Sequence, residues 1–190
     1  SLSLSARAKS ISAWNKSMQF CPTCGTKLEL CKTFTAKDCP NCKRQIFPQI
    51  EPCVIVLVNK EDKILLARHV QRNQDIYTCI AGFIEAGESA EEAVSREVKE
   101  EVGVDLLPEK GQVILSDIKK IEFGKVVNKI VDVWLFEYDG EVDLGNATTD
   151  EVAQVAWMNR EQIKELFDAN MFVNTLEYFF TEVDKQIGRA

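Results

Sequence analysis

The sequence predicts a domain that combines strands and helices, of the α/β (α+β) class, after a small cysteine-rich module. Short apolar runs of strand length recur from Pro52 onward, and one helix with clear start and stop signals lies among them. Four cysteines in two C-x-x-C pairs precede this region. Hydrophobic residues make up 45% of the 190 residues, which suffices for a packed core. The predicted division is a lead-in helix over residues 1–20, a cysteine module over 21–47 and the main domain over 48–190.

The first segment has the spacing of a helix, because Ala6, Ile11, Trp14 and Met18 would share one face. The chain begins with a serine and not with methionine, so we expect the native protein to be longer. No apolar run approaches the roughly 18 residues that a membrane-spanning helix needs, and no signal-peptide pattern opens the chain. We therefore expect no membrane partner.

The cysteine module contains a candidate zinc site. Cys21 and Cys24 form one C-x-x-C pair, Cys39 and Cys42 form another, and 14 residues separate the two pairs. Tetrahedral Zn²⁺ takes four thiolates, and this spacing is typical of a zinc ribbon. Four cysteine ligands leave no position open for water, so the predicted zinc is structural. A segment this short buries little core, and zinc would supply its folding free energy.

The remaining cysteines have other predicted roles. The chain has seven cysteines, an odd number, which favours metal binding in a reducing compartment over a disulfide framework. Cytoplasm is therefore the expected location. Cys31 is expected to be a spare thiol, whereas Cys53 and Cys79 lie in strand-like runs and are expected to be buried as small apolar side chains.

The main domain alternates predicted strands, loops and helices. The predicted strands cover residues 54–58, 64–67, 76–80, 130–138 and 152–158. A glycine-rich loop over residues 81–88 leads into the helix that has clear start and stop signals. The residues after Asn159 have helical spacing. The buried positions predicted there are Phe172, Leu176, Phe179, Phe180 and Val183.

The helix after the glycine-rich loop has capping residues at both ends. Ser89 is the predicted N-cap, and Glu92, three residues later, is its capping-box partner. Gly103 is the predicted C-cap. Gly82 and Gly87, in the preceding loop, allow tight turns and a close approach of the backbone to a ligand.

Three glutamates of this helix fall within one turn. Glu97 lies three residues before Glu100 and four before Glu101, so the side chains are neighbours on the helix surface. A hard divalent cation removes the repulsion between them, and carboxylate oxygens are the ligands that Mg²⁺ and Mn²⁺ prefer. Arg96 can orient Glu88 or Glu100 without competing for the metal. The pattern predicts a site that binds a metal ion and provides a general base. An isolated E-x-x-E-E string is usually only a solvated acidic face of a helix.

The stretch from Gly82 to Val104 resembles the Nudix signature G-x5-E-x7-R-E-U-x-E-E-x-G-U, in which U is aliphatic, at every specified position. The resemblance implies the Nudix fold, a mixed β-sheet between helices, with this loop and helix as the catalytic element. It also implies Mg²⁺ or Mn²⁺ as the catalytic cofactor. The implied reaction is hydrolysis of a nucleoside diphosphate that is linked to a further group X.

The resemblance implies roles for individual residues as well. Glu97 and Glu101 would be metal ligands, and the carbonyl oxygen of Ala81 would be a further ligand. Either Glu100 or Glu101 would help to deprotonate the attacking water. Arg96 completes the implied catalytic set.

A zinc ribbon followed by this box is the layout of bacterial NADH pyrophosphatases, and the resemblance to that family runs through nearly the whole chain. It implies that Phe47, at the junction over residues 46–56, helps to hold substrate. It implies that Glu151 is another metal ligand and that the protein is a homodimer. Phe83 is a further candidate for stacking on a base.

One departure from that family concerns the substrate. The family carries an S-Q-P-W-P-F-P array after the box, whereas residues 116–127 contain neither Trp nor Pro. Lys119, Lys120 and Lys125 would either bind phosphates or lie in a solvated loop. The only histidine, His69, would either contact substrate or lie at the surface at a strand end. We expect the catalytic residues to carry over, but not the NADH specificity.

The sequence leaves three functions open. The first is hydrolysis of NADH, NAD, ADP-ribose or a related dinucleotide or nucleotide sugar. The second is removal of an NAD-type cap from an RNA 5′ end, although a net charge of −7 and a pI near 4.9 disfavour a long RNA footprint. The third is a non-catalytic nucleotide-sensing module, which the intact carboxylates and arginine of the box disfavour.

Overall fold

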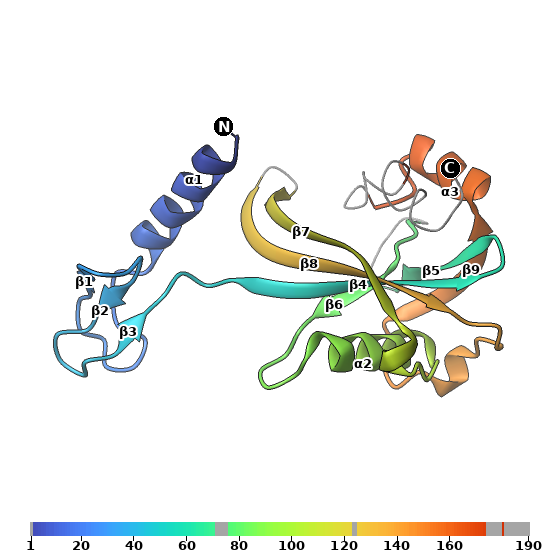
Figure 1. Cartoon of the computed structure of the whole chain (residues 1–190), viewed down its shortest axis with the longest axis horizontal. Helices are drawn as coiled ribbons and strands as arrows, with labels where there is room; N and C mark the ends of the chain where they lie inside the picture. The colour runs from blue at the N-terminus through green and yellow to red at the C-terminus, as the bar shows by residue number, and fades with distance from the viewer. Residues whose placement is uncertain (1, 71–75, 123–124, 174–179, 181–190) are drawn as a thin grey trace. The chain divides into compact units, whose positions relative to one another are not determined.

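The computed structural model describes residues 2–70, 76–122, 125–173 and 180 (Figure 1). The chain divides into two compact units, with one hydrophobic cluster in the first and two in the second among the described residues. The first unit comprises Ser1–Glu51 with Ile118–Lys129, and the second comprises Pro52–Asp117 with Ile130–Ala190.

The first unit contains one helix and three short strands. These are α1 (Leu2–Ser17), β1 (Glu29–Leu30), β2 (Lys37–Asp38) and β3 (Gln45–Ile46), and the strands pair antiparallel in that order. Lys37 ties the strands to the helix, because its Nζ donates hydrogen bonds to the carbonyl oxygens of Asn15 (2.8 Å) and Met18 (2.5 Å). A cation at this end satisfies unpaired carbonyls and complements the helix dipole.

The main sheet has the strand order β7-β8-β4-β5-β9, and β6 pairs with β4. The strands span Glu51–Lys60 (β4), Lys63–His69 (β5), Ile80–Phe83 (β6), Gln112–Glu122 (β7), Lys125–Glu137 (β8) and Val152–Asn159 (β9). The remaining elements are the helices α2 (Ala90–Val102) and α3 (Arg160–Asp168) and the 3-10 turns η1 (Pro108–Lys110) and η2 (Leu144–Asn146). Within the described residues, no helix combines the length and the apolar character needed to cross a lipid bilayer.

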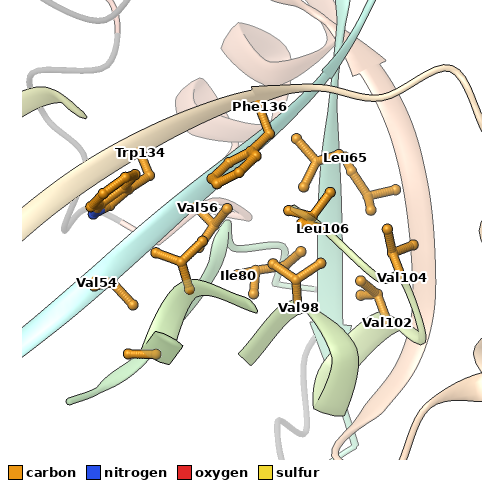
Figure 2. Packing of buried hydrophobic residues seen from close by; sticks show 13 residues of the cluster. Val54, Val56, Leu65, Ile80, Val98, Val102, Val104, Leu106, Trp134 and Phe136 are labelled. Atoms are coloured by element: carbon orange, nitrogen blue, oxygen red, sulfur yellow. The ribbon is translucent and has the colours of Figure 1, made fainter. Parts of the chain in front are cut away.

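Both faces of β4 are buried in the second unit, because α2 covers one face and α3 the other (Figure 1). Alternate residues from Val54 to Val58 pack against α2, together with Trp134 and Phe136 of β8 (Figure 2). The residues between them pack on the other face of the sheet, in a cluster that contains Ile163 of α3. A strand that is buried on both faces needs a continuous apolar run. The predicted arrangement of a sheet between helices is therefore confirmed.

The strand predicted over residues 76–80 is displaced in the structure. β6 spans Ile80–Phe83, and the last three of its residues fall in the predicted glycine-rich loop. They pair antiparallel with β4, so that Gly82 lies opposite Val54. The pairing with β4 therefore outweighs the weak intrinsic strand propensity of glycine.

The alternative that Lys119, Lys120 and Lys125 lie in a loop is wrong, because their backbones belong to the neighbouring strands β7 and β8. Paired lysines interrupt the apolar alternation there, which weakens the strand signal in the sequence. The side chains of Lys119, Lys120 and Lys125 lie outside the described residues, so phosphate binding by them stays a prediction.

The predictions of buried cysteines have two outcomes. Cys79 is buried, as predicted, in the cluster that contains α3. Cys53 is only half-buried, because it lies near the start of β4 and only packs against the edge of the same cluster.

The apolar residues after α3 contribute to the core of the second unit. Phe172 is buried, and Phe180 is half-buried against Phe167, with ring centroids 5.5 Å apart. The other positions predicted to be buried lie outside the described residues, namely Leu176, Phe179 and Val183.

Candidate active site

Helix α2 begins and ends at the residues that the sequence predicts. The Ser89 hydroxyl accepts a hydrogen bond from the Glu92 amide, and the Glu92 carboxylate accepts one from the Ser89 amide (2.8 Å). At the other end Gly103 has a φ of 72°, and its N–H donates to the carbonyl oxygen of Lys99 (3.1 Å). These caps fix both ends of the helix and thereby which of its side chains face the core.

Strand β6 and helix α2 approach each other closely at Gly82. A Cβ atom on Gly82 would lie 1.8 Å from Oε1 of Glu97, far inside van der Waals contact. Glycine therefore leaves the space that the Glu97 carboxylate occupies.

Arg96 holds three glutamates through its guanidinium group. Nε and Nη2 donate to the two oxygens of Glu88 (2.8 and 3.0 Å), and Nη1 donates to Glu97 (2.7 Å) and Glu100 (3.1 Å). Nη2 also donates to the carbonyl oxygen of Phe83 (2.9 Å). The hydrogen bonds with Glu88 raise the pKa of Arg96 and lower the pKa of Glu88. Arg96 therefore orients Glu88 and Glu100, the two partners named from the sequence.

Glu101 is a buried carboxyl group with few hydrogen-bond partners. Only 3% of the residue is exposed, and Oε2 has no hydrogen-bond partner among the described residues. Burial, with the charge of Glu97 second, raises the pKa of Glu101 to about 8. Burial also raises the pKa of Glu97, although Arg96 opposes this shift. A divalent cation at these carboxylates would supply the missing positive charge.

These side chains line one pocket of about 370 Å³ in the second unit. Its lining residues are His69, Ala81, Gly82, Phe83, Glu85, Arg96, Glu97, Glu100, Glu101, Thr149 and Glu151. Glu151 is the residue before β9, and its carbonyl oxygen accepts a hydrogen bond from the Val70 N–H (2.8 Å). The structure thus brings the predicted metal and base residues of the main domain together in one place.

His69 lies at the end of β5, and its contact with substrate stays a prediction. Its Nε2 lies 3.7 Å from Oε2 of Glu101, and the imidazole lines the pocket. β5 and β9 pair so that His69 lies opposite Val152, the residue after Glu151. His69 does lie at a strand end, as predicted, but strand pairing places that end at the site.

The two predicted substrate-binding aromatic residues lie in different units. Phe83 lines the pocket of the second unit with 51% of its surface exposed. Phe47 belongs to the first unit, where it is also exposed, and its ring centroid lies 6.4 Å from that of Phe34. Substrate binding by either residue stays a prediction.

The four paired cysteines form a cluster in the first unit. Their Sγ atoms all lie within 4.8 Å of one another, with 3.6 Å between Cys21 and Cys42 and 3.5 Å between Cys24 and Cys39. Zn–S bonds of about 2.3 Å in a tetrahedron place sulfur atoms about 3.8 Å apart. The donor set and its spacing therefore fit zinc, and Cys31 lies outside this cluster.

The two cysteine knuckles share one backbone geometry. The Gly25 N–H donates to the carbonyl oxygen of Cys21 (2.9 Å), and the Lys43 N–H donates to that of Cys39 (3.0 Å). Gly25 and Lys43 both have positive φ angles, 71° and 62°. Each C-x-x-C pair is thus closed by the same tight turn.

Residues 49–176 match the family described as the NUDIX domain. This match covers more than half of the chain and contains every residue that lines the pocket. The chain belongs to the Nudix family. The resemblance that the signature indicates is therefore confirmed, whereas the roles of single residues stay predictions.

Curated relatives of this Nudix protein bear the name NAD-capped RNA hydrolase NudC. Those from Salmonella heidelberg (strain SL476) and Salmonella typhi are 44% identical to it over 101 residues, which is 53% of this chain. The chain spans only 39% of the length of these relatives. Their names agree with the resemblance to the NADH pyrophosphatase layout.

Solved structures of Nudix proteins share the fold. A NUDIX hydrolase from Nitrosomonas europaea has a TM-score of 0.60 at 20% identity, over 74% of this chain and 91% of that chain. The MutT protein from Methanosarcina mazei Go1 has a TM-score of 0.55 at 19% identity, over 72% and 94%. At these identities the likeness concerns the fold alone, and it confirms the predicted α+β Nudix fold.

Proposed function

We propose that this chain hydrolyses the pyrophosphate bond of a nucleoside diphosphate linked to a further group X, with a divalent cation as cofactor. The observation that carries the proposal is the pocket in which Glu97, Glu100, Glu101 and Glu151 meet, with one carboxylate buried and its pKa raised. Such a concentration of negative charge is unfavourable without a cation. Membership of the Nudix family supports the reaction class.

Glu97, Glu101 and Glu151 are the proposed ligands of Mg²⁺ or Mn²⁺, together with the carbonyl oxygen of Ala81. All four residues line the pocket, and Oε2 of Glu101 has no hydrogen-bond partner among the described residues. Cations of this type take oxygen ligands. When bound, the metal would supply positive charge at the phosphate oxygens and lower the pKa of a water molecule.

Glu100 and Glu101 are the two candidates for the base that accepts the proton of the attacking water. Their surroundings differ, because Glu101 is buried while the Glu100 side chain is 36% exposed and bonded to Arg96 at 3.1 Å. Glu100→Gln and Glu101→Gln separate the two roles. Loss of a ligand weakens metal binding, whereas loss of the base lowers kcat and leaves metal affinity unchanged.

The proposed reaction adds water to one phosphorus and breaks the P–O–P bond. The proton passes to Glu100 or Glu101, and the products are a nucleoside monophosphate and a second phosphate ester. Arg96 keeps the carboxylates in place through its hydrogen bonds to them. Phe83, exposed at the pocket, offers a stacking surface for a base, and Phe47 is the second proposed aromatic contact.

NAD-type compounds are the proposed substrate class, that is NADH, NAD, ADP-ribose or a related dinucleotide or nucleotide sugar. NAD-capped RNA is the second candidate, because the relatives that are 44% identical are named for it. The same bond would break in a free dinucleotide and in a cap. A net charge of −7 favours a small substrate over a long RNA, which needs a basic footprint.

The test is to incubate the zinc-loaded chain and Mg²⁺ or Mn²⁺ with NADH, NAD, ADP-ribose, nucleotide sugars and an NAD-capped RNA. We expect monophosphate release from a free NAD-type compound, and no release by Glu101→Gln. Cleavage of the capped RNA alone would select the second candidate. Failure to cleave any compound, by folded protein that binds Mn²⁺, would contradict hydrolysis and favour nucleotide sensing.

Further proposals concern the rest of the protein. We propose that zinc in the first unit is structural, because its four thiols leave no position for water. The need for reduced thiols favours the cytoplasm as the compartment. A homodimer is proposed from the NADH pyrophosphatase resemblance. The proposed division is a lead-in helix over 1–20, a zinc ribbon over 21–47 and a Nudix domain over 48–190.

A further inference from the structure

We propose that Thr149 is a positioning residue that holds the metal ligand Glu151 against the carboxylates of α2. The inference rests on the proposed function, because it concerns the same metal site. Glu151 comes from a loop far from α2 in the sequence, so its place in the pocket needs a tertiary contact that spacing along the helix does not provide.

Thr149 caps the carboxyl end of α2 from outside the helix. Its Oγ1 donates to the carbonyl oxygen of Glu100 (2.9 Å), and its N–H donates to the same oxygen (3.2 Å). The last carbonyl groups of an α-helix have no partner within the helix, so such an oxygen is available to an outside donor. Two donors of one residue thus fasten the loop before β9 to the turn that carries Glu100 and Glu101.

The same loop is held at two further points. A Cβ atom on Gly103 would lie 2.7 Å from backbone atoms of Asn146 and Ala147, so the loop packs directly on the end of α2. Beyond Thr149, the carbonyl oxygen of Glu151 accepts the Val70 N–H (2.8 Å). The backbone of Glu151 is therefore held directly by Val70, the residue after β5, and two residues earlier through the Thr149 anchor on α2.

This anchor acts against electrostatic repulsion. The carboxylates of Glu97, Glu101 and Glu151 line one pocket, and like charges this close repel one another. A side chain on a loop can swing away from such repulsion unless its backbone is held. The Thr149 hydroxyl keeps the backbone near Glu151 in place, so the ligands are already assembled when a cation arrives.

Mn²⁺ binding without substrate tests the inference on the full, zinc-loaded chain. Free Mn²⁺ is followed by electron paramagnetic resonance as the metal is titrated into wild type, Thr149→Val, Thr149→Ser and Thr148→Val. The valine keeps the shape of threonine but lacks the hydroxyl, and the serine restores it. Thr148→Val makes the same change at an exposed neighbour that does not line the pocket.

We expect Thr149→Val to bind Mn²⁺ about 3- to 10-fold more weakly, the effect of roughly one lost hydrogen bond. Thr149→Ser and Thr148→Val should stay within about twofold of wild type, since neither removes the hydroxyl contact. Thermal unfolding shows which variants are folded in the assay. Thr149→Ala replaces Thr149→Val if the valine variant is unfolded.

Wild-type affinity in the folded variant without the hydroxyl would overturn the inference and leave the proposed metal site intact. Weak binding by Thr149→Ser would also overturn it, because the hydroxyl would then not be the feature that matters. A wild-type protein that binds no Mn²⁺ would overturn the proposed function, and this inference with it.

Discussion

At Gly82 a hydrogen atom stands where any other residue would place a Cβ atom 1.8 Å from Oε1 of Glu97. Backbone strain does not explain this glycine, because the positive φ angles among the described glycines belong to Gly25, Gly87 and Gly103. The Glu97 carboxylate is the far end of a flexible side chain, so it can move away from a methyl group. A substitution here acts on the position of a proposed ligand more than on the fold.

We therefore expect Gly82→Ala to fold normally but to bind Mn²⁺ about 10- to 100-fold more weakly, the range seen when the support of a metal ligand is lost. kcat/KM should fall with the metal affinity, while Tm stays close to that of wild type. Mn²⁺ titration and thermal unfolding of the same preparation measure both effects. Gly145→Ala is the matched control, because the three atoms nearest to its Cβ all belong to the Asp143 side chain, outside the pocket. Unchanged Mn²⁺ affinity in Gly82→Ala would contradict the prediction that the space at Gly82 sets the position of a metal ligand.

The residues of the site differ in how far the sequence predicts them. Glu97 lies near Glu101, and Arg96 near Glu100, because side chains four residues apart are neighbours on a helix. His69 and Thr149 come from β5 and from the loop before β9, and their approach to α2 depends on how these segments pair and pack. No pattern along the chain predicts such pairing. Nothing in the sequence therefore pointed to Thr149 as a residue of the site, and the position of His69 stayed open.

At the scale of elements, α2 is encoded locally and β6 and β7 are not. The capping box of Ser89 and Glu92 and the C-cap Gly103 act within a few residues of the helix ends, so their signals are present in the sequence. β6 is a strand because β4 pairs with its glycine-containing backbone. β7 is a strand because β8 lies beside it. Strand propensity depends on such neighbours, which explains both errors.

Gly103 joins the end of α2 to the loop that carries Glu151, and its substitution should affect stability. Its φ of 72° strains any residue with a side chain, and a Cβ atom would lie 2.7 Å from three backbone atoms of that loop. Unlike the Glu97 carboxylate at Gly82, these backbone atoms cannot swing aside.

We expect Gly103→Ala to lower the free energy of unfolding by at least about 1–3 kcal/mol, the usual cost of a strained backbone conformation. Urea denaturation measures the change. Gly145→Ala, in the same loop and without a positive φ, should change it by less than about 0.5 kcal/mol. Equal urea midpoints for Gly103→Ala and wild type would mean that the loop can retreat from α2 at little cost.

At the scale of the whole molecule, the two units draw their stability from different sources. The second unit has apolar clusters on both faces of its sheet. The buried cluster of the first unit consists of Cys21, Leu28 and Cys39, so two of its three buried members are proposed zinc ligands. Among the side chains that the structure describes, this unit has almost no core without the metal.

Loss of zinc should therefore unfold the first unit and leave the core of the second intact. Cys24→Ser removes one ligand of the cluster, and Cys31→Ser makes the same change at a thiol outside it. We expect zinc analysis to find the metal in Cys31→Ser but not in Cys24→Ser. Limited proteolysis should cleave Cys24→Ser within residues 18–46 and spare the strands and helices of the second unit. Zinc retention with protease resistance in Cys24→Ser would refute four-thiolate binding, because three cysteines would then suffice to fold the ribbon.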